Sequence, residues 1–395
     1  MRLPSALALI AAVPAAYLAL RRLIGVRGAL AAAAIVAVNP GLVGFATDAR
    51  SYGLLVLTGL LSLWGFSALL ERATRWRYAA WVAASVACLW THYFGAFLIA
   101  GEAVILFVVL RDARRATLVC CLAIAVCVAP LIPLVAHQNG SEDAAFIAGI
   151  PLGSRLEATV RQFAMGPNVP RTWLEGAGLA LAVLGAVAGA VLAVRRREAR
   201  PLLVLAVLAF GVPLAIAVLG IEDRFYARNL VAVLPLSAGF VALGLVRARA
   251  APLAVYLALC VLTSVWIATN WRYEQLDWRT AVARMASADP LAAVVATDAG
   301  DAPVVRTYLG RDPAPSVRAN AVWLAIEPAR GPHQRALNPE PVPAGVAAAL
   351  PGFRPVRELD VHGFRLILER AVAPRPITAV PGEAVFGPRA PPSAP

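Results

Sequence analysis

The sequence predicts a polytopic α-helical membrane protein of about ten transmembrane helices, with a small C-terminal extracytoplasmic α/β domain. Mean hydropathy is +0.72, and 60% of the 395 residues are hydrophobic while 15% are charged. A soluble domain of this length cannot bury so much apolar surface. Long apolar stretches are separated by short connecting segments, and only every second one of these segments carries an arginine cluster. Lipid must therefore solvate most of the chain.

Apolar runs long enough to cross a bilayer, which takes roughly 17–25 residues, define the membrane part. They lie at about 5–20, 28–46, 53–70, 78–91, 94–110, 116–136, 173–194, 201–219, 229–246 and 252–270. The apolar character then stops. We expect a transmembrane domain over 1–270, an extracytoplasmic α/β domain over 271–370 and a Pro-rich disordered tail over 371–395.

One set of connecting segments is rich in arginine, and the segments between them are poor in arginine or balanced by acids. The rich set comprises Arg21, Arg22 and Arg27; Arg72, Arg75 and Arg77; Arg111, Arg114 and Arg115; Arg195, Arg196, Arg197 and Arg200; and Arg247 and Arg249. By the positive-inside rule this set is cytoplasmic. The other loops, and everything after Asn270, are therefore expected to face outward.

The net charge of +13 does not indicate nucleic acid, because the arginines lie in membrane-flanking loops where topology explains them. The chain has no lysine, which is typical of a GC-rich genome. The five cysteines all fall inside apolar runs, where a free thiol behaves as a small hydrophobe. We expect neither disulfides nor a metal–thiolate site.

Outside the spans, the sequence predicts a few further elements. Ser154–Ala164 is an amphipathic stretch of the kind that lies flat on a membrane surface. In the C-terminal domain, Asp277 is expected to cap a helix. The remaining expectations are helical spacing over Trp278–Met285, strands at Leu291–Thr297 and Val322–Ile326, a short helix at Pro303–Leu309, and a hairpin of Phe353–Leu359 and Phe364–Leu368.

The first polar cluster lies between the second and third predicted spans, with Asn39–Pro40 ahead of Asp48, Arg50 and Tyr52. Charged groups at the edge of the hydrocarbon are costly unless partnered. Asp48 is a candidate ligand for a divalent metal or a substrate group, and Arg50 a candidate for binding a phosphate. The alternative is an ordinary polar turn with a local ion pair.

Two more clusters are predicted on the same face. His92 and Tyr93 join two spans with almost no loop, so His92 is a candidate contact to a metal, a sugar or a phosphate. Alternatively, Tyr93 is an interfacial anchor and His92 is incidental. Arg224 and Arg228 are candidates for a phosphate clamp, since a helix would place both on one side. The alternative is a re-entry loop with interfacial aromatics.

Together these segments resemble the GT-C membrane glycosyltransferases, specifically the bacterial branch similar to glycosyltransferase family 39. That branch includes protein O-mannosyltransferases, aminoarabinose transferases and rhizobial lipopolysaccharide-core transferases. The resemblance covers roughly residues 2–310. The matching motifs are Arg2–Leu3–Pro4–Ser5, Asn39–Pro40 followed by Asp48–Ala49–Arg50–Ser51–Tyr52, Thr91–His92–Tyr93, Arg228 with Pro235, and Asp277–Trp278–Arg279.

The resemblance implies a multi-pass enzyme of the bacterial inner membrane. It would take a sugar from a polyprenyl-phosphate carrier at the outer face and pass it to a lipid, glycan or protein. Its other expected partners are membrane lipids, and no nucleic acid is expected. The implied chemistry is inverting displacement with an aspartate base, often with a divalent ion such as Mg or Mn. Asp48 is the catalytic candidate. Arg50, Tyr52, His92, Tyr93, Arg224 and Arg228 would bind substrate, and Asp48 and His92 would ligate the metal.

One departure from the family concerns the usual catalytic aspartate, which lies in a loop ahead of the Arg-Leu-Pro-Ser motif. This sequence opens on that motif, so the first span and first outer loop are expected to be missing. The chain is then either active in a longer form or a catalytically dead truncated homologue. The remaining alternative is a transporter or flippase of lipid-linked sugars. That function needs polar groups deep in the spans, of which Glu102 is the clearest.

Overall fold

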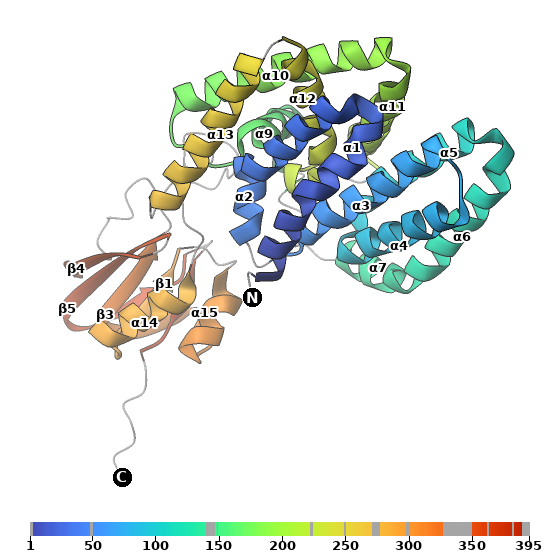
Figure 1. Cartoon of the computed structure of the whole chain (residues 1–395). Helices are drawn as coiled ribbons and strands as arrows, with labels where there is room; N and C mark the ends of the chain where they lie inside the picture. The colour runs from blue at the N-terminus through green and yellow to red at the C-terminus, as the bar shows by residue number, and fades with distance from the viewer. Residues whose placement is uncertain are drawn as a thin grey trace. The chain divides into compact units, whose positions relative to one another are not determined.

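The structure is a computed structural model. It describes residues 3–47, 50–139, 147, 149–221, 224–248, 250–270, 277–297, 301–326, 350–361, 363–380 and 383–388. The chain forms two compact units, Met1–Ser264 and Val265–Pro395. The first unit is helical and the second contains a sheet (Figure 1).

The helical unit is built from long apolar helices joined by short 3₁₀ turns. The helices are α1 (Leu3–Val38), α2 (Pro40–Thr47), α3 (Tyr52–Glu71), α4 (Arg75–Thr91), α5 (Ala96–Val109), α6 (Arg114–Val128), α7 (Ile132–Asn139), α9 (Leu152–Met165), α10 (Thr172–Arg195), α11 (Arg200–Val218), α12 (Leu234–Ala248) and α13 (Ala250–Thr269). The 3₁₀ turns include η1 (Tyr93–Gly95) and η6 (Ala227–Val233).

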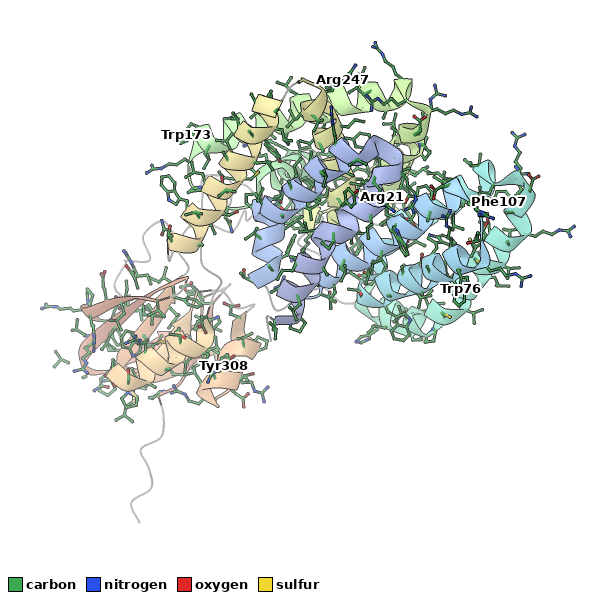
Figure 2. The ribbon with its side chains drawn as sticks, in the orientation of Figure 1. Arg21, Trp76, Phe107, Trp173, Arg247 and Tyr308 are labelled. Carbon is green, nitrogen blue, oxygen red and sulfur yellow. The ribbon has the colours of Figure 1, made fainter. Side chains whose placement is uncertain are left out.

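Seven helical segments of the described chain are long and apolar enough to cross a membrane. They are Leu3–Val38, Tyr52–Glu71, Arg111–His137, Thr172–Arg195, Arg197–Val218, Ala227–Ala248 and Ala250–Thr269. Large apolar side chains are exposed on their outer faces. Trp173, for example, is 59% exposed and projects outward from the start of α10 (Figure 2). Such a surface requires lipid, so the chain is a multi-pass membrane protein.

The predicted count of ten spans is not reproduced among the described residues. The predicted runs 5–20 and 28–46 fall within α1 and α2, and two other runs form shorter helices. The helix α4 has 17 residues, and Tyr93–Val109 is a shorter apolar helix. At 1.5 Å per residue, α4 is about 26 Å long, which is less than the roughly 30 Å of hydrocarbon in a bilayer.

The helix α1 contains a break at Gly25, where φ is 77° and ψ is 168°. This backbone conformation is strained for residues with a Cβ but open to glycine. Two helical segments therefore meet there, next to Arg21, Arg22 and Arg27. The break coincides with the first arginine-rich connection that the sequence predicts between two spans.

Glycines allow α10 and α12 to pack closely. A Cβ added at Gly189 would overlap the Phe240 carbonyl oxygen, and one added at Gly244 would overlap the Gly185 carbonyl oxygen. Gly185 and Gly189 form a GxxxG pattern, which lets helix backbones approach each other in membranes. This contact helps to fix the position of η6, which is followed directly by α12.

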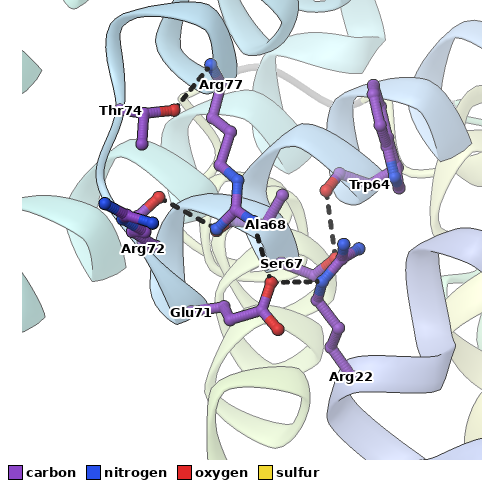
Figure 3. Close-up of polar contacts among 8 residues, drawn as sticks. All are labelled: Arg22, Trp64, Ser67, Ala68, Glu71, Arg72, Thr74 and Arg77. Atoms are coloured by element: carbon purple, nitrogen blue, oxygen red, sulfur yellow. Dashed lines mark hydrogen bonds and ion pairs between the residues drawn. The ribbon is translucent and has the colours of Figure 1, made fainter.

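Two of the predicted arginine clusters meet at one end of the bundle. Glu71, at the end of α3, accepts from Arg22 of α1 at 3.0 Å and from Arg77 of α4 at 3.1 Å (Figure 3). The other end of α3 carries Tyr52, and at 1.5 Å per residue the 20-residue helix separates these ends by about 30 Å. The arginine pattern of the sequence predicts that these two ends lie on opposite membrane faces.

The predicted amphipathic stretch forms α9, but its buried side packs on protein. Arg155, Ala158 and Thr159 are buried, and α9 contacts α2, α10 and η6. Arg161 pairs with Glu157 at 2.7 Å and with Glu175 of α10 at 2.9 Å. The helix is therefore part of the bundle, and lipid is not needed to cover its buried side.

The C-terminal unit holds a six-stranded mixed sheet in the order β2-β6-β1-β3-β5-β4. The strands β1 and β3 are parallel, and the other pairs are antiparallel. The strands are β1 (Ala293–Ala296), β2 (Pro313–Ala314), β3 (Ser316–Ile326), β4 (Arg354–Val361), β5 (Phe364–Thr378) and β6 (Ala384–Phe386); the helices are α14 (Trp278–Ala288) and α15 (Ala302–Leu309). The predicted hairpin, strands and helices of this domain are confirmed.

Asp277 does cap α14, since its carboxylate accepts from the Thr280 amide at 3.2 Å. The expectation of disorder from residue 371 is wrong for much of that segment. The strand β5 continues to Thr378 and pairs with β3, and Ala384–Phe386 pairs with β1. The segment is rich in alanine and proline, which do not indicate a strand. Its packing comes from the buried side chains of Ile377, Val385 and Phe386.

Candidate functional site

One cavity of about 310 Å³ lies at the end of the helical unit where α3 begins and α4 ends. Its lining residues come from distant parts of the sequence and are Arg50, Tyr52, His92, Tyr93, Phe94, Ile147, Arg224, Arg228 and Asn229. Six of them are the substrate-binding candidates of the sequence. The seventh candidate, Asp48, lies outside the described residues.

Arg50 and Tyr52 reach the cavity because α3 starts there. Ser5 of α1 donates from its hydroxyl to the Arg50 carbonyl oxygen at 2.9 Å. Gly53 lets the two helices touch, since a Cβ there would lie 2.7 Å from the Ser5 carbonyl oxygen. The Tyr52 ring is buried between Phe45, at 4.9 Å between centroids, and His92, at 6.0 Å.

His92 ends α4 in an extended conformation, and its amide donates to the Cys88 carbonyl oxygen at 3.0 Å. Its Nδ1 accepts from the Phe94 amide at 3.3 Å, which assigns the proton of the neutral ring to Nε2. Burial, together with the positive charge of Arg228, holds the pKa of His92 below its ordinary value of 6.5. The imidazole is therefore neutral at pH 7 and carries a donor at Nε2.

Arg224 and Arg228 belong to a segment that has residues both in the cavity lining and in the buried core. Phe225 is buried and meets Phe210 edge to face at 5.4 Å, while Arg224 and Arg228 on either side line the cavity. The guanidinium of Arg228 lies 5.3 Å from the Tyr226 ring centroid, a cation–π distance. The residues before η6, which begins at Ala227, are not helical, so the helical spacing that grouped these arginines is wrong although both line the cavity.

Asn39 does not reach the cavity. It is fully buried between α1 and α2, where its Oδ1 accepts from the amides of Gly41 and Leu42 at 3.0 and 3.1 Å. Its Nδ2 donates to the Phe163 carbonyl oxygen at 3.0 Å. The Asn39–Pro40 motif thus caps α2 and joins it to α9.

The described part of the chain does not assemble a metal site. Among its residues, no group of three or more His, Cys, Asp or Glu side chains lies close enough to hold an ion. The described cavity lining offers one side chain of a metal-ligating type, His92, beside arginines that repel cations. Asp48, the other proposed ligand, is outside the described residues, so the predicted Mg or Mn ion stays a prediction.

Beyond the predicted site residues, the cavity lining includes Phe94, Ile147 and Asn229. Asn229 directly follows Arg228, so its position next to a candidate residue was a signal in the sequence. Arg155, which donates to the Phe225 carbonyl oxygen, also had a signal in the sequence. It shares the buried side of α9 with Ala158 and Thr159, where a charged side chain is unusual. Ile147 has no such signal, since its position depends entirely on tertiary structure.

Comparison with known proteins gives one structural likeness. No protein-family model and no curated protein matches the sequence. Among solved structures, the chain is similar to the crystal structure of the Archaeoglobus fulgidus oligosaccharyltransferase in complex with Zn and sulfate, with a TM-score of 0.37 and 16% sequence identity. The match covers 78% of this chain and 44% of that one. The chain therefore spans less than half the length of that protein.

Proposed function

We propose that this chain is a membrane glycosyltransferase that moves a sugar from a polyprenyl-phosphate carrier to a lipid, glycan or protein acceptor at the outer membrane face. The observation that carries the proposal is the shared cavity. Three arginines and four rings from separate segments line it, at the end of the bundle away from the ion pairs of Glu71. A lipid-anchored phosphate with a sugar attached has both the charge and the ring surface that such a lining can bind.

The arginines supply the phosphate contacts. Guanidinium groups bind phosphate through charge-assisted, often bidentate hydrogen bonds, and Arg50, Arg224 and Arg228 line one cavity. Tyr226 lies against Arg228, which limits the conformations that this side chain adopts. A phosphate bound here would place the attached sugar near Tyr52, His92 and Tyr93, where the Nε2 proton of His92 can donate to a sugar hydroxyl.

The proposed reaction is an inverting displacement at the anomeric carbon. The acceptor oxygen forms a bond to that carbon, the bond from the carbon to the phosphate oxygen breaks, and the acceptor proton passes to a carboxylate. Asp48 is the candidate for that base. As the bond breaks, the carrier phosphate gains one negative charge. Arginines that are already in place stabilise this charge more in the transition state than in the ground state.

The alternative of a transporter receives less support from the spans. Glu102 is fully buried in α5, where it accepts from Trp81 of α4 at 2.8 Å and from Ser62 of α3. It therefore cross-links three helices and does not line the cavity. The described charged groups of that cavity gather at one end of the bundle, which suits an interfacial enzyme better than a path through the membrane.

The direct test is transfer by the purified chain in liposomes supplied with radiolabelled polyprenyl-phosphate sugars. Replacing Arg224 or Arg228 by Gln removes a charge-assisted contact of about 1.5–3 kcal/mol, so we expect transfer to fall by about tenfold or more. Arg75→Gln is the matched control. Arg75 is exposed at the start of α4, at the far end of that helix from His92, and its loss should leave transfer unchanged.

Two outcomes would count against the proposal. One is label that crosses the liposome membrane still attached to its carrier, without transfer, which identifies a flippase. The other is transfer that survives the loss of both Arg224 and Arg228. The same assay tests the ion, because removal of divalent cations by a chelator should abolish transfer if Asp48 and His92 ligate Mg or Mn.

A further inference from the structure

A side chain of the helix α9 holds the segment with Arg224 and Arg228 through a hydrogen bond to its backbone. Arg155 of α9 is 4% exposed, and its Nη1 donates to the Phe225 carbonyl oxygen at 3.1 Å. That carbonyl lies one residue after Arg224, in the non-helical stretch before η6. A hydrogen bond from a buried guanidinium is among the stronger ones in proteins, so it restrains the backbone between Arg224 and Arg228.

Asn229 restrains the same segment from its other end. Its Nδ2 donates to the Arg224 carbonyl oxygen at 2.8 Å, and its amide donates to the Tyr226 carbonyl oxygen at 2.9 Å. These bonds close a compact loop over residues 224–229. Three successive carbonyl oxygens, those of Arg224, Phe225 and Tyr226, thus accept from Asn229 or Arg155.

We propose that Arg155 and Asn229 are positioning residues, which hold the 224–229 segment so that Arg224 and Arg228 present both guanidinium groups to one anion. Arg155 is itself kept in place because α9 is anchored at its C-terminal end. Asn39 and Tyr256 donate to the carbonyl oxygens of Phe163 and Ala164, which lie at that end of the helix. The role in anion binding rests on the proposed function, whereas the restraint on the backbone does not.

The restraint is tested by hydrogen exchange of the full chain in lipid nanodiscs, read by mass spectrometry over residues 224–233. Arg155→Gln removes the charged donor, and Asn229→Asp keeps the shape of Asn229 without an N–H to donate. We expect each to speed exchange of this segment by about tenfold. Arg155→Lys keeps a charged donor and should restore slower exchange.

Arg161→Gln is the matched control on the same helix. It breaks the ion pairs of Arg161 with Glu157 and Glu175, and both of these partners lie outside the segment, so it should lower thermal stability and leave exchange over 224–233 as in the wild type. The proposal is overturned if Arg155→Gln leaves this exchange unchanged, or if Arg161→Gln speeds it as much as Arg155→Gln does.

A second measurement separates this proposal from the proposed function. The probe is a short-chain polyprenyl phosphate without sugar, titrated into the nanodiscs. We expect Arg155→Gln to raise its dissociation constant by about tenfold, Arg155→Lys to restore binding, and Arg161→Gln to have no effect. If the wild type binds and Arg155→Gln binds equally well, the positioning role fails and the proposed function stands. If the wild type does not bind, the proposed function fails, and the exchange experiment still decides the restraint.

Discussion

The imidazole of His92 stacks on the phenol ring of Tyr52, with the centroids 6.0 Å apart and the planes inclined by 28°. Tyr52 is the first residue of α3 and His92 follows the last residue of α4. The contact therefore forms where two antiparallel helices return to the same end of the bundle. It limits rotation of the imidazole, whose Nδ1 is already occupied by the Phe94 amide.

Removing the charge of Arg228 should raise the pKa of His92. Burial is the larger cause of the low pKa of this imidazole, and the positive charge of Arg228 is the second. In Arg228→Gln the repulsion between the two cations disappears, so the pKa should move upward and still remain below 6.5. An NMR titration of the His92 ring protons measures the shift. An unchanged or lower pKa in Arg228→Gln would contradict the arrangement.

The stability of the chain should depend on pH through His92. Its pKa is lower in the folded chain than its ordinary value of 6.5, so the unfolded chain binds more protons just below that pH. Stability is therefore expected to fall as the pH drops through 6.5. Thermal unfolding between about pH 5 and about pH 8 measures this trend. His92→Asn should flatten it, and a slope that persists in this variant assigns the effect to other groups.

Replacing Gly189 by Ala should destabilise the helical unit. The added Cβ would overlap the Phe240 carbonyl oxygen of α12, and overpacking of this kind costs about 1–3 kcal/mol. Gly211→Ala is the matched control, because a Cβ there meets no atom within 4 Å. Thermal melts in detergent should show a clear loss for Gly189→Ala and little change for Gly211→Ala. Equal melting temperatures would disprove the close contact of α10 and α12.

Glu102 distinguishes the enzyme from the transporter. Glu102→Gln keeps an oxygen that accepts from Trp81 and Ser62, so the cross-link of α3, α4 and α5 should persist and transfer should continue. Glu102→Ala leaves both donors without this acceptor, at a cost of about 1–3 kcal/mol, and should lower the melting temperature. A transporter coupled to proton movement through this acid would instead stop working in Glu102→Gln, whereas melting would hardly change.

Much of the fold follows from composition and spacing, because membrane helices and the strands of a buried sheet have strong local signals. The run Tyr52–Glu71 is predominantly apolar, and Ala293–Ala296 is a continuous buried strand. The boundaries of helices and strands and the number of spans were less predictable. Gly25 interrupts the helical backbone inside α1, and the 371–378 stretch gains its structure from pairing with β3.

The sequence by itself determined that this is a multi-pass membrane protein and which polar residues are candidates for the site, since charges at the edge of hydrocarbon are costly and therefore conspicuous. Only the tertiary structure decided that Arg50, Tyr52, His92, Tyr93, Arg224 and Arg228 line one cavity. It also decided that Asn39 caps a helix and that Arg155 restrains the arginine segment. The physical reason is that these roles depend on contacts between helices far apart in the chain, which local patterns do not encode.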